Sequence, residues 1–210
     1  MNEIPVSMKK EICECYRKPD KCNGKLSICL LTFEITRRCN LSCIHCMKGD
    51  AQSVDIDPEV FDLVFENFGI AYRIGFAGGE IMLNLGALRY ALESLKKHNV
   101  RVDSVMFTTN GIIQDPEFLE IYDEYLAYVR KPKECKILIS NDIFHRHSSG
   151  KSQKEMEAIL KFFRNGKRRN KVSFQDVYSM GTIYRVGRAT EKYKKVPLNY
   201  LNSSLTISAL

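Results

Sequence analysis

The chain has 210 residues, of which 44% are hydrophobic and 27% charged, and its formal net charge is +7. This length and composition are typical of one sizeable globular domain, and no apolar run approaches the ~18–20 residues that a membrane helix requires. The first residues lack the apolar core of a secretory signal. We therefore expect a cytoplasmic protein whose eight cysteines stay reduced and serve metal or redox chemistry.

Strand and helix patterns alternate along the chain from residue 26. Strands are predicted at 26–36, 72–78, 101–111, 135–142 and 172–189, and a last one in the C-terminal "SLTISAL". Helices are predicted at 57–69, 83–99, 115–129 and 152–166. Buried strands joined by helices indicate parallel crossovers, and a closed eightfold barrel needs roughly 200–250 residues. We expect an α/β fold, a partial (open) parallel β/α barrel of about five to six strands.

The same patterns divide the chain into three segments. Residues 1–25 are expected to be an N-terminal extension, residues 26–190 the core, and residues 191–210 a tail with the last strand. Three cysteines of the extension, Cys13, Cys15 and Cys22, are candidate ligands of a second metal.

Polar clusters follow each predicted strand, where parallel α/β folds gather their reactive groups. The clusters hold Cys39, Cys43 and Cys46 after the first strand, Gly78, Gly79 and Glu80 after the second, Asn110 after the third, and Ser140, Asp142, His145 and His147 after the fourth. We expect these residues to meet at one edge of the sheet.

The three cysteines of "CNLSCIHC" predict an iron–sulfur cluster. Cysteine thiolates hold the iron corners of a 4Fe–4S cubane, so three cysteines would leave one iron open for a small ligand. A zinc site is one alternative, although no fourth ligand lies at a conventional spacing and His45 falls between two of the cysteines. A thioredoxin-like pair of Cys43 and Cys46 is another.

The sequence resembles the radical S-adenosylmethionine (SAM) superfamily. "CNLSCIHC" matches the Cys-x3-Cys-x2-Cys loop of that family, and "GFAGGE" matches its second-strand motif, with Ile81 where proline commonly follows. The resemblance covers residues 26 to about 190. It implies a 4Fe–4S cluster and SAM as cofactors, with the open iron binding the amino and carboxylate groups of the methionine part of SAM.

The resemblance also implies roles for the residues at the strand ends. Gly78 and Gly79 would let the backbone approach SAM, and Glu80 would pair with its ammonium group or, alternatively, be a solvent-exposed carboxylate at a helix start. Asp142 and its neighbour Ser140 would bind the ribose hydroxyls, unless the aspartate only caps a turn.

The remaining candidates have structural alternatives as well. Asn110 would line the pocket or shape an Asn-Gly turn. His145 and His147 are the candidate catalytic residues, for substrate contact or proton movement, with a hydrogen-bonded loop histidine as the alternative.

The function implied is reductive cleavage of SAM to a 5′-deoxyadenosyl radical that abstracts hydrogen from a substrate, most simply a peptide or protein side chain. A low-potential electron donor of the flavodoxin or ferredoxin type and anaerobic conditions would be needed. The alternatives are a glycyl-radical activase and a nucleoside- or RNA-modifying enzyme. The RNA alternative rests on the basic stretch 161–171, whose simpler interpretation is a solvated helix end. A non-catalytic iron–sulfur or redox-sensing protein is the alternative of another class.

Overall fold

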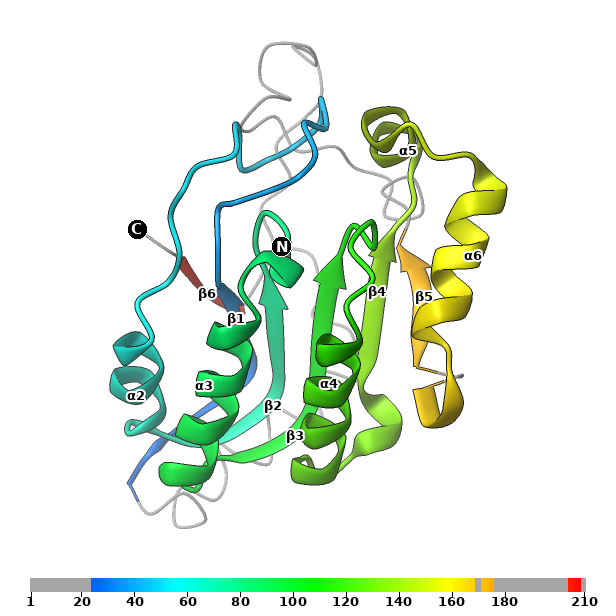
Figure 1. The fold of residues 1–210 in the computed structure, drawn as a ribbon. Coiled ribbons are helices and arrows are strands. Elements are labelled where there is room, and N and C mark those ends of the chain that lie inside the picture. Colours follow the sequence, from blue (N-terminus) through cyan, green and yellow to red (C-terminus); the bar gives the residue numbers. More distant parts are fainter. Residues whose placement is uncertain (1–23, 169–170, 176–203, 209–210) are drawn as a thin grey trace, which may run out of the picture.

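Strands and helices alternate along the chain (Figure 1). The structure is a computed structural model that describes residues 24–168, 171–175 and 204–208. The strands are β1 (Leu26–Glu34), β2 (Phe68–Ala77), β3 (Arg101–Thr109), β4 (Lys136–Ser140), β5 (Val172–Gln175) and β6 (Ser204–Ser208). The α-helices of these ranges are α2 (Glu59–Phe65), α3 (Leu85–Lys97), α4 (Pro116–Tyr128), α5 (Ile143–Ser149) and α6 (Gln153–Phe163). The predicted α/β class is confirmed.

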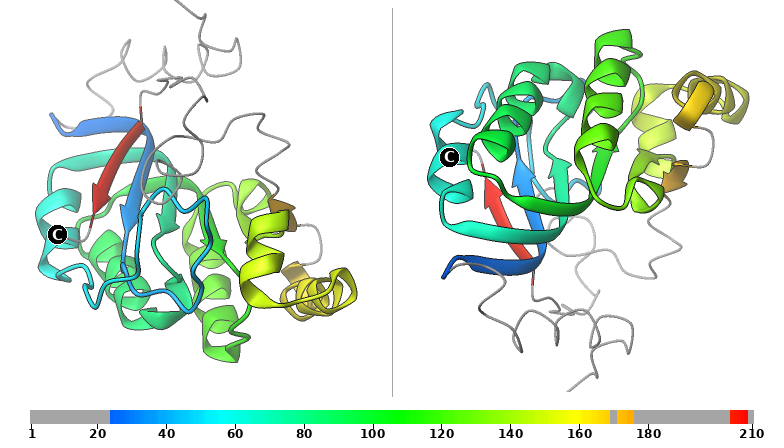
Figure 2. Two further views of the ribbon diagram at one scale, coloured as in Figure 1. Left: turned by 90° about the horizontal axis from the view of Figure 1, so that it is seen from above. Right: turned by 90° about the horizontal axis from the view of Figure 1, so that it is seen from below.

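The six strands form one parallel sheet in the order β5-β4-β3-β2-β1-β6. β5 and β6 lie at its two edges, so the sheet is open, and views along the strands show that it is bent (Figure 2). The predicted partial (open) parallel β/α arrangement of about five to six strands is confirmed. Because the strands are parallel, the segments that follow β1 to β4 all leave from the same edge of the sheet.

Helices α2, α3, α4 and α6 cover one face of the sheet (Figures 1 and 2). Leu31 and Phe33 of β1 point toward them and are fully buried, with the Phe33 ring 4.9 Å from that of Phe61 in α2. Across the sheet, Phe33 pairs with Phe76, and Phe76 pairs with Phe107. Their ring centroids lie 6.0 and 5.1 Å apart. The core is therefore an aromatic and aliphatic layer between sheet and helices.

The opposite face of the sheet has a different composition. Thr32, Gly75 and Met106 are paired across β1, β2 and β3. They alternate with the aromatic row, and both Thr32 and Met106 are partly exposed. This face therefore has a hydroxyl side chain and a glycine where the helix-covered face has two phenylalanines, beside the partly exposed Met106.

The first predicted helix is shorter than the sequence pattern indicates. The prediction ran over 57–69, but α2 ends at Phe65, and β2 begins at Phe68, which pairs with Leu26 of β1. Pairing with the neighbouring strand therefore outweighs the local helix pattern. Asp57 still accepts a hydrogen bond from the backbone two residues on, at 3.0 Å.

Much of the predicted extension and tail lies outside the described residues. This holds for residues 1–23, including Cys13, Cys15 and Cys22, and for most of the tail. Within the tail, β6 forms where the last apolar run indicated a strand. No helix in the described ranges is long and apolar enough to span a membrane.

Candidate functional site

Residues 35–56, which make up most of the segment between β1 and α2, form the cysteine loop. Hydrogen bonds hold its two arms side by side at the base, from the Arg37 amide to the Val54 carbonyl at 2.8 Å and from the Gln52 amide to the Arg37 carbonyl at 3.0 Å. Thr36 donates a hydrogen bond to Asp55 at 2.6 Å across the same gap. The loop is therefore closed at its base and projects beyond the C-terminal ends of the strands (Figure 1).

The three cysteines of this loop lie near one another. Burial raises the pKa of the Cys39 thiol, and the neighbouring charges of Glu80, Cys43 and Cys46 raise it further. The amide of Cys46 donates to the Cys43 carbonyl at 3.0 Å, which turns the chain between these two cysteines. Thiolates brought together in this way repel one another, so a cationic group between them is the partner that such an arrangement favours.

The donor set of the loop consists of three free thiols, those of Cys39, Cys43 and Cys46. Structural zinc sites have four protein ligands, and His45, which lies between two of the cysteines in sequence, places its Nε2 3.6 Å from Asp142 Oδ2. Cysteine thiolates hold the iron corners of a 4Fe–4S cubane, so three of them fit a cubane with one iron left open.

The turn after β2 packs directly against the cysteine loop. The Gly79 amide donates to the Thr36 carbonyl and the Glu80 amide to the Arg38 carbonyl, both at 2.8 Å. A Cβ added at Gly78 would lie 2.4 Å from the Thr36 oxygen, and one at Gly79 would lie 2.2 Å from the Arg38 oxygen. Close packing against the backbone of the cysteine loop therefore explains why both positions are glycine. The predicted contact of these glycines with SAM stays a prediction.

Glu80 is fully buried at the end of β2. Its Oε1 accepts hydrogen bonds from Thr109 Oγ1 at 2.7 Å and from the Met82 amide at 3.1 Å, and its Oε2 accepts one from the Asn110 amide at 2.7 Å. Burial raises the pKa of Glu80, against the effect of these hydrogen bonds. The carboxylate does start a short 3-10 helix, Ile81–Leu83, but the solvent-exposed alternative for it is wrong.

Asn110 at the end of β3 connects this turn to the cysteine loop. Its Nδ2 donates to Asn40 Oδ1 at 2.8 Å, and its Oδ1 accepts from the Ile112 amide at 3.0 Å. It therefore shapes its turn and also contacts the residue that follows Cys39. Asn40 was missed as a functional candidate, although it stands in the quoted cysteine motif.

Asp142 caps a helix that the sequence patterns did not predict. It is the N-cap of α5, and its Oδ1 accepts from the amides of Phe144 and His145 at 2.9 and 3.0 Å. The carboxylate is 1% exposed. The capping alternative is therefore correct as far as it goes. Ribose binding by Asp142 and by the partly exposed Ser140 remains a prediction.

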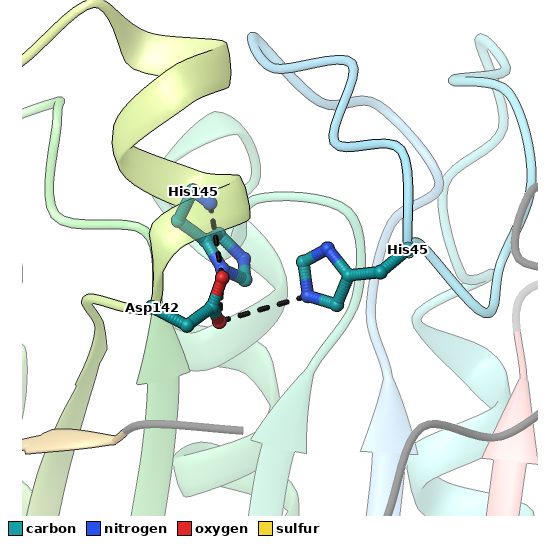
Figure 3. A group of neighbouring side chains, drawn as sticks. All are labelled: His45, Asp142 and His145. Atoms are coloured by element: carbon teal, nitrogen blue, oxygen red, sulfur yellow. Dashed lines mark hydrogen bonds and ion pairs between the residues drawn. The ribbon is translucent and has the colours of Figure 1, made fainter. Parts of the chain in front are cut away.

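Figure 3 shows three side chains that join α5 to the cysteine loop. Asp142 Oδ2 lies 2.6 Å from His145 Nδ1 and 3.6 Å from His45 Nε2. Their ligand atoms all lie within 4.8 Å, so the group has the spacing of a metal site. The His45 ring also stacks on that of Phe144, with centroids 4.6 Å apart. Through these contacts, α5 packs against the cysteine loop at His45.

His145 is in contact with both Asp142 and Cys43. Burial alone would lower its pKa, but hydrogen bonds to Asp142 and to Cys43 raise that pKa to about 9. The same pair with His145 lowers the pKa of Asp142, although burial would raise it. His145 is thus brought to the cysteines, whereas His147 is exposed on the same helix and is not part of this group.

Two arginines of the basic stretch 161–171 are engaged in contacts within the protein. Arg168 forms an ion pair with Asp123 of α4 at 2.7 Å. Arg164 donates from Nε and Nη2 to the Val172 carbonyl at 3.1 and 3.0 Å. Arg164 therefore contacts the start of β5 and Arg168 contacts α4, which favours the simpler interpretation of this stretch.

Two curated relatives each match less than half of the chain. The antilisterial bacteriocin subtilosin biosynthesis protein AlbA of Bacillus subtilis (strain 168) is 32% identical over 103 residues, 45% of this chain and 21% of the relative. A GTP 3′,8-cyclase of Chlorobaculum tepidum is 35% identical over 86 residues, 39% of this chain and 25% of the relative. The match therefore spans a quarter or less of each relative.

A solved structure and a family model complete the comparison. The structure of anSMEcpe with bound AdoMet superposes with a TM-score of 0.51 at 19% identity, covering 88% of this chain and 52% of that one, which shows a common fold. The model of the radical SAM superfamily matches residues 33–174, from the end of β1 into β5. Members of that superfamily are enzymes that use a 4Fe–4S cluster and SAM. The chain belongs to the radical SAM superfamily.

Proposed function

We propose that this chain binds a 4Fe–4S cluster through Cys39, Cys43 and Cys46 and uses SAM to modify a peptide or protein side chain. The observation that carries the proposal is the junction between the cysteine loop and the Gly78–Glu80 turn. The two backbone hydrogen bonds of 2.8 Å bring the motif of the second strand to the first cysteine. That juxtaposition supports one site that holds cluster and SAM together.

The chemistry belongs to the bound groups, and the protein residues hold and orient them. When bound, a reduced cluster supplies the electron that cleaves SAM to methionine and a 5′-deoxyadenosyl radical, which takes a hydrogen atom from the substrate. Glu80 already accepts three hydrogen bonds, so we propose that it acts on the SAM ammonium group mainly through its buried negative charge. We propose that Ser140 and Asp142 bind the ribose hydroxyls of SAM and that Asn110 lines the SAM pocket.

A peptide or protein substrate is supported by the similarity to a bacteriocin biosynthesis protein, since bacteriocins are peptides or proteins. The similarity to a GTP cyclase supports a nucleotide substrate as the competing choice. Both similarities are confined to part of each relative. The choice between the two substrates therefore needs a direct comparison.

The first experiment tests catalysis without a substrate. The protein is reconstituted with iron and sulfide under anaerobic conditions, reduced with dithionite in place of its flavodoxin- or ferredoxin-type donor, and incubated with SAM. We expect 5′-deoxyadenosine, measured by chromatography, from the wild-type protein and none from Cys43→Ala. An intact cluster that gives no 5′-deoxyadenosine would favour the non-catalytic alternative.

The second experiment compares substrates. A panel of synthetic peptides and GTP are added separately, and the rate of 5′-deoxyadenosine formation is measured with the mass of each added compound. We expect stimulation and a mass change with peptides. Stimulation by GTP alone would refute the peptide assignment while leaving SAM cleavage intact.

A further inference from the structure

Glu34, the last residue of β1, is a buried carboxylate beneath the cysteine loop. Its residue is 1% exposed, and neither of its oxygens accepts a hydrogen bond from another described residue. It lies on the face of the sheet opposite to the fully buried Phe33. A buried carboxylate needs a compensating positive charge, which neighbouring side chains must supply.

Two cations from the two halves of the cysteine loop supply that charge. Lys48, two residues after Cys46, places its Nζ 3.0 Å from Glu34 Oε2. Arg37, two residues before Cys39, places its Nε 3.8 Å from Glu34 Oε1. One carboxylate therefore contacts the chain immediately before the first cysteine and immediately after the last.

The chain contains a comparable carboxylate far from the cysteines. Asp103 of β3 is 3% exposed and also has two basic partners, Arg130 Nη1 at 3.3 Å and Lys131 Nζ at 2.9 Å. It lies near the start of its strand, whereas Glu34 lies at the end of its strand. Because the strands are parallel, Asp103 lies toward their N-terminal ends and Glu34 lies at their C-terminal ends.

We propose that Glu34 is a positioning residue for the cluster. By binding Arg37 and Lys48, Glu34 fixes the distance between Cys39 and Cys46. This inference rests on the proposed cluster site. The turn after β2, Asn110 and α5 contact the loop at Arg38, Asn40 and His45, and the two pairs of Glu34 hold the segments on either side of the cysteines. These two pairs also set the charge near the cluster, because the three side chains together carry one net positive charge.

The removal of each partner has a different consequence. Lys48→Met leaves the buried carboxylate without its nearer cation, so the carboxylate draws in water or Arg37 and displaces the loop. Glu34→Gln leaves a lysine that is 36% exposed and can be hydrated, and an arginine that keeps its hydrogen bond to Gln52. We therefore expect Lys48→Met to be the more damaging, and the double variant Glu34→Gln/Lys48→Met to recover part of the loss.

The experiment measures how firmly the cluster is held. Wild type, the two single variants, the double variant and Asp103→Asn are reconstituted anaerobically, and iron loss to an added iron chelator is followed by absorbance. Groups outside the ligand shell typically change metal affinity by about 10- to 100-fold, and we expect iron loss from Lys48→Met to be faster by a factor in that range. Asp103→Asn should hold iron as the wild type does, whatever its effect on unfolding.

A second readout separates positioning from general stability. The EPR spectrum of the dithionite-reduced cluster should change in Glu34→Gln and stay unchanged in Asp103→Asn, with urea unfolding of the cluster-free proteins measured alongside. Wild-type retention and spectra in both Glu34→Gln and Lys48→Met would overturn the inference. So would a double variant that loses iron as fast as the product of the two single effects predicts. A wild-type protein that assembles no cluster would instead refute the proposed function.

Discussion

Replacing Gly79 by alanine tests the junction on which the candidate site depends. An added Cβ would lie 2.2 Å from the Arg38 carbonyl oxygen and 3.0 Å from the Cβ of Cys39. Ordinary contact begins at 3.4 Å, so the oxygen must retreat by about 1.2 Å. That shift breaks the hydrogen bond of 2.8 Å from the Glu80 amide to the same oxygen. Overpacking at about 1–3 kcal/mol and a lost hydrogen bond at about 1 kcal/mol give a destabilisation of about 2–4 kcal/mol.

Gly86→Ala is the matched control for this substitution. Gly86 lies in α3, and an added Cβ there meets nothing within 4 Å. Alanine is the better helix former, so we expect no loss of stability and a gain of up to about 1 kcal/mol. Both variants are compared with wild type by urea unfolding of the cluster-free protein and by iron content after reconstitution. Gly79→Ala with wild-type stability and iron content would refute the argument that close backbone packing requires a glycine there.

Three further predictions concern stability, each measured by urea or thermal unfolding. Tyr122 and Tyr125 are fully buried in α4, but only Tyr125 has a hydroxyl partner among the described residues, the Leu88 carbonyl at 2.8 Å. Tyr125→Phe should therefore lose about 1 kcal/mol, and Tyr122→Phe should be neutral or stabilising, with equal losses counting against this account. Hydrogen bonds from a lysine, a serine, a histidine and a tyrosine of α3 and its C-cap hold the pKa of Asp62 below its usual 3.8. The contribution of the Asp62 carboxylate to the free energy of unfolding is thus complete above about pH 4 and decreases at lower pH. The difference in unfolding free energy between wild type and Asp62→Asn should therefore become smaller on acidification, and a constant difference would contradict this. Asn84→Ala removes the N-cap of α3, which should be destabilising by about 1 kcal/mol or more, and an unchanged midpoint would argue against the cap.

The sequence predicted the elements whose patterns are long and regular. The helix of 83–99 carries an apolar stripe that includes Leu88 and Leu92, and these side chains are buried in α3. The three cysteines and Glu80 were recognisable because their spacing is distinctive in the chain alone. By contrast, α5 has seven residues and two histidines, too short a segment for a helical period to stand out.

Contacts between distant segments escaped prediction for a different reason. Glu34 stands in the apolar run "FEIT", and nothing local indicates that Lys48 would return to it. The glycines after β2 were explained by a ligand, whereas the structure gives them backbone neighbours, Thr36 for Gly78 and Arg38 for Gly79. Such pairings depend on the packing of the loop against the sheet, which single-sequence patterns do not encode.

The place of β6 has a consequence for how the protein is made. Leu30 of β1 pairs with Ser204, so β1 acquires this neighbour only after a much later part of the chain has left the ribosome. Until then, the unpaired amides and carbonyls of β1 form an open strand edge that other chains can join. Contacts between such distant positions form slowly. Deleting the β6 segment should therefore leave a chain that self-associates through β1.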